Sequence, residues 1–213
     1  MYKKDTRKLT FPGVVSTLLA AVLLVYSLLQ AFNTVAPCQM PREWDVLRDI
    51  GIAQSLEDGR YPEDPVLAGE ISWYNPLTAL LLTVTRFISG ISLMRIAVLS
   101  GPIINLLAPV AFYVLVFVLF GHGAALAALF LFLFGKDGTT PSYWTCAYSP
   151  WLLAPLYSSG LLFFTLALFK NAIEKKSNAY FIATGLMLGL TFLGHTAPAV
   201  IAGATMALLT AVE

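Results

Sequence analysis

The sequence predicts an all-α polytopic membrane protein with about five transmembrane helices and a long first extracytoplasmic loop that contains short interfacial helices. Two observations predict this fold class. Of the 213 residues, 58% are hydrophobic and 12% are charged, whereas soluble domains carry about 25% charged residues. In addition, several charge-free segments are about 20 residues long, which is enough to cross a hydrocarbon core of roughly 30 Å.

The first predicted span covers residues 11–32, which hold no charge and follow four basic residues, Lys3, Lys4, Arg7 and Lys8. This run is longer than the core of a cleaved signal peptide, so we interpret it as an uncleaved anchor. The other candidate spans are 96–120, 121–135, 151–169 and 179–212. Segment 121–135 is the weakest, because it is short and holds His122. Segment 179–212 is interrupted only by His195 and is too long for one simple span.

The positions of lysine and arginine predict the orientation, because basic residues accumulate in cytoplasmic loops. The N-terminal basic cluster predicts a cytoplasmic N-terminus in the cell membrane, and Lys170, Lys175 and Lys176 predict a second cytoplasmic loop. Three spans must then separate the first outer loop from Lys170. Segment 76–91 is accordingly expected to be an interfacial or re-entrant helix on the outer face. An arrangement in which 76–91 crosses and 121–135 does not has the same parity and stays open.

Acidic residues gather in the first outer loop, residues 34–95. Positions 42–70 hold eight of the 12 acidic residues and three basic ones, as expected for one solvated segment. A second outer loop covers residues 136–150. Cys38 and Cys146 both fall on the outer face, which is a compartment that permits disulfides. A bridge between them and two free thiols are both open.

A short amphipathic helix is predicted over residues 44–57, closed by Gly59. Its apolar residues recur at helical spacing: Val46, Leu47, Ile50, Ala53 and Leu56. Glu43 and Asp45 lie at its N-terminus, where free N–H groups and the helix dipole favour carboxylates. Asp45 therefore has two interpretations, as a cap of this helix or as a group that carries chemistry.

Four short motifs follow the predicted anchor. They are Trp44-Asp45, then Ala53-Gln54-Ser55-Leu56-Glu57-Asp58-Gly59, then Tyr74-Asn75-Pro76-Leu77, and finally a glycine-rich segment that ends at His195. In this order and topology they resemble the membrane-embedded glycosyltransferases of the GT-C fold. The resemblance extends over most of the chain. Because enzymes of this type continue with more spans, we expect residues 1–213 to be a single transmembrane domain from the N-terminal portion of a longer module.

The resemblance implies a transferase that takes a sugar from a polyprenyl-phosphate-linked donor to a glycan, lipid or protein acceptor at the outer face. Asp45 matches the general base of such enzymes, with Glu43 in reserve, because a positioned carboxylate can take the proton of a weakly nucleophilic sugar hydroxyl. His195 matches a basic position near the donor phosphate that is lysine in several relatives. A histidine is only partly charged at neutral pH. The alternative for His195 is a buried polar residue bonded to a neighbouring helix.

Further substrate-binding candidates are Arg48, Tyr74 and Asp137. In the resembling enzymes an acidic residue of the second outer loop often binds metal or acceptor, so a divalent metal ion is the cofactor considered. Asp137 is the acidic residue of that loop, but Lys136-Asp137-Gly138 is also an ordinary turn sequence. Asp49 on the loop helix is an alternative. The sequence has no glycine-rich phosphate loop, CxxC pair or metal-spaced histidine cluster, and no nucleic-acid partner is expected.

Two other functional classes stay open. A transporter or flippase would place polar residues along several spans, and apart from His195, Asn105 and scattered Ser and Thr the spans lack them. Gly101-Pro102 and Pro109 nevertheless allow the broken helices of transporters. The third hypothesis is a membrane assembly subunit without chemistry, which the short chain favours.

Overall fold

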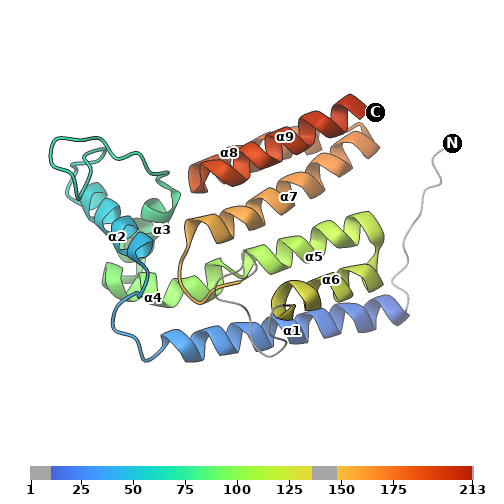
Figure 1. Ribbon diagram of the computed structural model, residues 1–213, viewed down its shortest axis with the longest axis horizontal. Helices are drawn as coiled ribbons and strands as arrows, with labels where there is room; N and C mark the ends of the chain where they lie inside the picture. The colour runs from blue at the N-terminus through green and yellow to red at the C-terminus, as the bar shows by residue number, and fades with distance from the viewer. Residues whose placement is uncertain (1–10, 136–147, 213) are drawn as a thin grey trace.

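The computed structural model describes residues 11–135 and 148–212, and this part of the chain is helical apart from turns and one isolated β-bridge. Its helices are α1 (Phe11–Val35), α2 (Trp44–Glu57), α3 (Leu77–Ser89), α4 (Leu93–Ile104), α5 (Leu107–Phe120), α6 (His122–Phe134), α7 (Ala154–Lys175), α8 (Asn178–Gly194) and α9 (Thr196–Val212). Figure 1 shows α1 and α5–α9 running side by side as a bundle, with α2 and α3 gathered at one end. The all-α prediction is confirmed over these residues.

Three helical stretches are long and apolar enough to cross a membrane: α1, the α4–α5 pair over Leu93–Phe120, and α7. The helices α3, α6, α8 and α9 are also apolar but shorter. Apolar side chains cover the outside of α1, where Leu18 is 61% and Val22 is 63% exposed. Soluble monomers rarely leave large continuous apolar surfaces in water, so the helices are compatible with a multi-pass membrane protein.

The predicted span 96–120 is divided into α4 and α5 at Asn105. Pro102 lies inside α4, where it has no N–H to donate and its ring disturbs the preceding turn. The Asn105 side chain donates to two carbonyl oxygens of the extended segment 148–153. That segment packs so closely on α4 that a Cβ on Gly101 would lie 2.2 Å from one of its carbonyl oxygens. The break therefore fixes where α7 begins.

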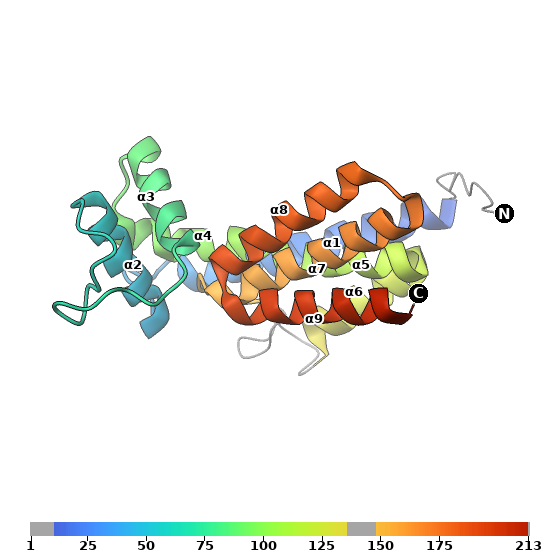
Figure 2. The ribbon, with the colours of Figure 1, turned by 90° about the horizontal axis from the view of Figure 1, so that it is seen from above.

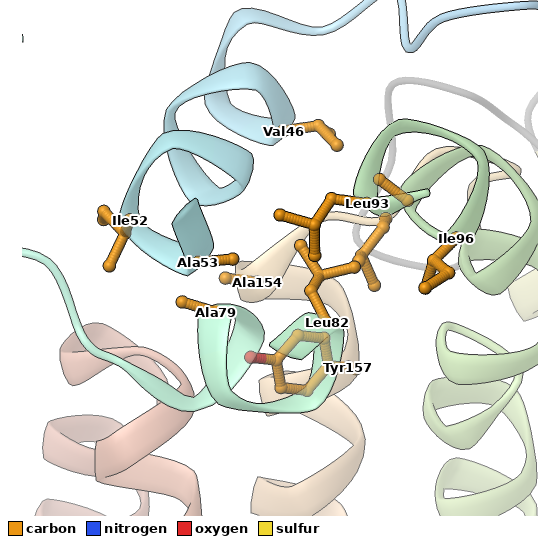
Figure 3. Close-up of a cluster of buried hydrophobic side chains, with 11 residues drawn as sticks. Val46, Ile52, Ala53, Ala79, Leu82, Leu93, Ile96, Ala154 and Tyr157 are labelled. Atoms are coloured by element: carbon orange, nitrogen blue, oxygen red, sulfur yellow. The ribbon is translucent and has the colours of Figure 1, made fainter. Parts of the chain in front are cut away.

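The helices α2 and α3 form a cap on one end of the bundle (Figures 1 and 2). α2 has the bounds that the apolar spacing predicts, Trp44–Glu57. One hydrophobic cluster, drawn in Figure 3, joins α2 and α3 to α4 and to the start of α7. Within it Val46, Ile52 and Leu82 are at most 1% exposed, and burying such a side chain stabilises by about 1.5–3 kcal/mol. The cluster thus holds α2 over the end of the bundle.

The apolar segment 179–212 forms two helices, α8 and α9, that run in opposite directions and meet at His195 (Figure 2). The break expected at Pro198 lies three residues earlier, because Pro198 sits in the first turn of α9, where its missing N–H removes no helical bond. Gly194 ends α8 against α7, and a Cβ there would lie 2.3 Å from the Ser158 hydroxyl oxygen. The α8–α9 turn lies at the bundle end that carries α2 and α3.

Candidate functional site

A cavity of about 280 Å³ lies where the cap meets the bundle. Its lining comes from α2, the segment before α3, the start of α7 and the α8–α9 turn: Asp45, Arg48, Asp49, Tyr74, Asn75, Ala154, Pro155, Gly194 and His195. Four of the six predicted site residues are in this set, namely Asp45, Arg48, Tyr74 and His195. The volume is close to the lower end of ligand sites, roughly 300–1,000 Å³, and suits a group of the size of one sugar.

Arg48 is at the centre of the polar lining. Its Nη1 donates to Asp45 Oδ1 at 2.9 Å, and its Nε and Nη2 donate to Asp49 Oδ1 at 3.2 and 3.0 Å. Asp45 and Arg48 can meet because residues three apart share one face of a helix. The guanidinium also lies over the Tyr74 ring, with Cζ 3.6 Å from the ring centroid, a contact worth about 0.5–2 kcal/mol. The α2 helix thereby presents a fixed cation between two carboxylates.

Asp45 is the more exposed of these carboxylates, with 62% of its side chain accessible. It lies in the first turn of α2, whereas the cap position belongs to Glu43, whose side chain makes no capping hydrogen bond. Asp45 therefore does not cap the helix. Its carboxylate lies beside Arg48 at the cavity wall, whereas Glu43 is not among the described residues that line the cavity. A ligand in the cavity can reach the Asp45 carboxylate.

Asp49 is the buried carboxylate, with 3% of the residue exposed. Burial raises its pKa to about 6, because desolvation disfavours the charged form more than Arg48 stabilises it. The Thr78 side chain on α3 also hydrogen-bonds Asp49, and the Thr78 hydroxyl lies 2.8 Å from the Tyr157 hydroxyl on α7. Since a threonine hydroxyl has one hydrogen, Thr78 donates to Asp49 and accepts from Tyr157. This chain of bonds ties α2 to both helices.

His195 lies in the α8–α9 turn, where its Nδ1 accepts a hydrogen bond from the Ala197 N–H at 3.3 Å. In the neutral ring the hydrogen is therefore on Nε2, which leaves Nε2 as a donor. Asn75 holds this turn in place: its Nδ2 donates to the Phe192 carbonyl at 2.6 Å, and its Oδ1 accepts from the Thr196 hydroxyl at 3.2 Å. Asn75 was not among the predicted site residues. The signal that could have found it is its place inside the Tyr-Asn-Pro-Leu motif.

Asp137, a candidate for substrate binding, lies outside the described residues. Cys146, which could form a disulfide with Cys38, also lies outside them. In the two described ranges, no three His, Cys, Asp or Glu side chains form a group that could hold a metal ion. At the cavity itself, Arg48 already lies between the two carboxylates. These residues therefore do not fit a divalent cation, which needs several free oxygen ligands.

Comparison with known proteins gives no relative. No family model, curated protein or solved structure matches this chain. The function that can be proposed for it accordingly depends on the chemistry of the cavity and on the apolar bundle beneath it. That chemistry combines an accessible carboxylate, a fixed guanidinium and an imidazole donor.

Proposed function

We propose that the chain forms a glycosyltransferase site that moves a sugar from a polyprenyl-phosphate-linked donor to an acceptor hydroxyl at the extracytoplasmic membrane face. The observation that supports this function is that Asp45, Arg48 and His195 line one cavity at the end of an apolar helical bundle. A proton acceptor and two donors for an anion are the groups that such a transfer requires. The position of the cavity at the end of an apolar bundle supports a donor that is carried on a lipid.

In the proposed reaction, the donor phosphate binds Arg48 and the Nε2–H of His195. The acceptor oxygen attacks the anomeric carbon, its proton passes to the Asp45 carboxylate, and the bond from the anomeric carbon to the phosphate oxygen breaks. Polyprenyl phosphate leaves with the electron pair of that bond. Because Arg48 holds Asp45 by a hydrogen bond of 2.9 Å, the phosphate is proposed to bind before Asp45 takes the proton. A phosphate that takes the Arg48 donors frees Asp45 to meet the acceptor hydroxyl.

The proposed topology has the cap outside and a cytoplasmic N-terminus in the cell membrane. Its support is that α7 ends, near Lys175, at the bundle end where α1 begins, and the cap is at the opposite end (Figure 1). We propose that α3 is an interfacial helix on the outer face. Its Phe87 is 90% and its Ile88 is 78% exposed, and Trp73 just before it is 91% exposed. Aromatic and aliphatic side chains of this kind are favoured at the level of the lipid headgroups.

The decisive experiment compares Asp45→Asn with Asp58→Asn in the full chain reconstituted into lipid nanodiscs. Both aspartates are on or next to α2 and pair with an arginine, but Asp58 does not line the cavity. Polyprenyl-phospho-sugars are supplied with candidate acceptors, and release of polyprenyl phosphate is measured. We expect Asp45→Asn to lower the rate by about 10²–10⁴-fold and Asp58→Asn to leave it unchanged. Equal rates for the two variants would contradict the role of Asp45.

A transporter is the second candidate, because the apolar stretch Leu93–Phe120 is interrupted at Asn105 between α4 and α5, as discontinuous helices are in transporters. The same nanodiscs distinguish the two functions. A transporter would bind the lipid-linked sugar and leave its phosphate bond intact with every acceptor.

A further inference from the structure

Asp49 lines the cavity and has no part in the reaction described above. It is also the best-anchored of the polar groups there. Its Oδ1 accepts two hydrogen bonds from Arg48, and Thr78 and Tyr157 connect it to α3 and α7. Burying a charged carboxylate costs free energy unless other groups compensate the charge. A buried carboxylate with this many partners is therefore a candidate for a functional role.

The charge of the site indicates what Asp49 does. With both carboxylates ionised, Asp45, Asp49 and Arg48 sum to a net negative charge, which repels an incoming phosphate. Asp45 is exposed, so water can screen its charge. Asp49 is buried against Arg48, and its charge is screened far less. An anion that binds Arg48 therefore interacts most unfavourably with ionised Asp49, and this repulsion disappears if Asp49 takes a proton.

We propose that Asp49 is a positioning residue that holds the Arg48 guanidinium over Tyr74 and takes up a proton when the phosphate of the lipid-linked donor binds Arg48. This inference rests on the proposed function, since it assumes that the anion is a donor phosphate. After protonation, Asp49 still offers its carbonyl oxygen to Arg48, so the guanidinium keeps its place. Arg48 then has its full positive charge available for the phosphate.

The titration of Asp49 supports this exchange. Burial raises the pKa of Asp49 to about 6 in the free protein, and a phosphate beside Arg48 raises it further by adding negative charge. Between these two pKa values binding takes up a proton, so affinity falls as pH rises through this window. Below the pKa of the free protein, Asp49 is already protonated and uptake disappears. The groups that face Asp49 are Arg48 and Asp45 on α2, Tyr74 before α3, Thr78 on α3, Tyr157 on α7 and His195 in the α8–α9 turn.

The test measures proton uptake by calorimetry on the full chain in nanodiscs, in buffers of different ionisation enthalpy. The probe is farnesyl methyl phosphodiester, which has one negative charge and no proton of its own to exchange near neutral pH. For the wild type we expect an uptake that approaches about one proton per bound probe near pH 7 and falls to about zero near pH 5. Binding without uptake at any pH, or no binding of the probe, would overturn the inference.

Three variants assign the proton. Asp49→Asn keeps an oxygen for Arg48 but cannot titrate. When it is combined with His195→Gln, which removes the imidazole from the site, proton uptake should vanish and Kd should no longer depend on pH. His195→Gln should keep the uptake per bound probe, which excludes the imidazole as the source. Thr78→Val removes a hydrogen bond that lowers the pKa of Asp49, so the uptake window should move to higher pH even if the Asn variant does not fold. Uptake that persists in the Asp49→Asn, His195→Gln double variant, or a window unmoved by Thr78→Val, would contradict the proposal.

The outcomes separate this inference from the proposed function. Sugar transfer without proton uptake would leave the glycosyltransferase standing and remove the role of Asp49. Proton-linked binding of the probe without sugar transfer would support the role of Asp49 in anion binding and contradict the transferase.

Discussion

Replacing Gly101 with alanine tests whether the α4–α5 break determines the start of α7 and, with it, one wall of the cavity. The added Cβ would lie 2.2 Å from the Pro150 carbonyl oxygen and 2.6 Å from the Leu152 nitrogen. Both are backbone atoms, so no side-chain rotation can relieve the overlap. An ordinary contact requires the extended segment to move away from α4 by about 1 Å.

The expected cost combines three contributions. Overpacking of a well-packed site costs about 1–3 kcal/mol, and a backbone clash belongs at the upper end. Displacing the segment also weakens the two hydrogen bonds from Asn105 to its carbonyl oxygens, each worth about 1 kcal/mol. Alanine recovers about 1 kcal/mol through its higher helix propensity. We therefore expect Gly101→Ala to lower the free energy of unfolding by about 2–4 kcal/mol, and Tm by roughly 5–15 °C for a chain of this size.

The matched control is Gly189→Ala, because Gly189 is also inside a helix but a Cβ there meets no atom within 4 Å. Its Tm should stay the same or rise slightly. Thermal unfolding of both variants in the same detergent, followed by loss of the monodisperse peak in size-exclusion chromatography, measures the difference. If Gly101→Ala were as stable as Gly189→Ala, the close packing of segment 148–153 on α4 would be wrong.

Three further predictions concern topology and the site. In a cysteine-free background, a membrane-impermeant thiol reagent should label Asp64→Cys from outside the cell and Lys175→Cys only after permeabilisation. Labelling of position 64 from the cytoplasm alone would overturn the orientation. Asn75→Ala loses two bonds to the α8–α9 turn, so we expect a loss of about 1–2 kcal/mol and weaker binding of the phosphodiester probe. Asn171→Ala, whose bond stays within its own helix, is its control and should keep the binding. Tyr157→Phe removes the hydroxyl that bonds Thr78, so we expect it to lower the free energy of unfolding by about 1 kcal/mol. The control is Tyr26→Phe, because Tyr26 is more exposed. An equal or smaller loss of stability in Tyr157→Phe than in this control would contradict the bond.

The sequence alone predicted those features of the helices that depend on residues close together along the chain. The bounds of α2 follow from apolar residues that repeat every three or four positions, and Gly59 lies just beyond its end. Charge-free length likewise predicts α1 and α7 as candidate spans. In the site, Asp45 and His195 were selected by motif and position alone. These features are local, because hydrogen bonds within a helix join residues four apart and hydropathy is a property of each segment by itself.

The tertiary structure decided what these residues touch. Pro102 is visible in the sequence, but α4 ends at Asn105 because that side chain binds carbonyl oxygens of a segment more than 40 positions away. The burial that raises the pKa of Asp49 depends on α3 and α7 packing over α2, and no pattern within α2 distinguishes Asp49 from Asp45 in this respect. His195 reaches the cavity because Gly194 fits against α7 and Asn75 holds the turn. Burial and contacts between distant segments arise only when the helices pack, so the sequence supplied the polar groups and the packing brought them into one cavity.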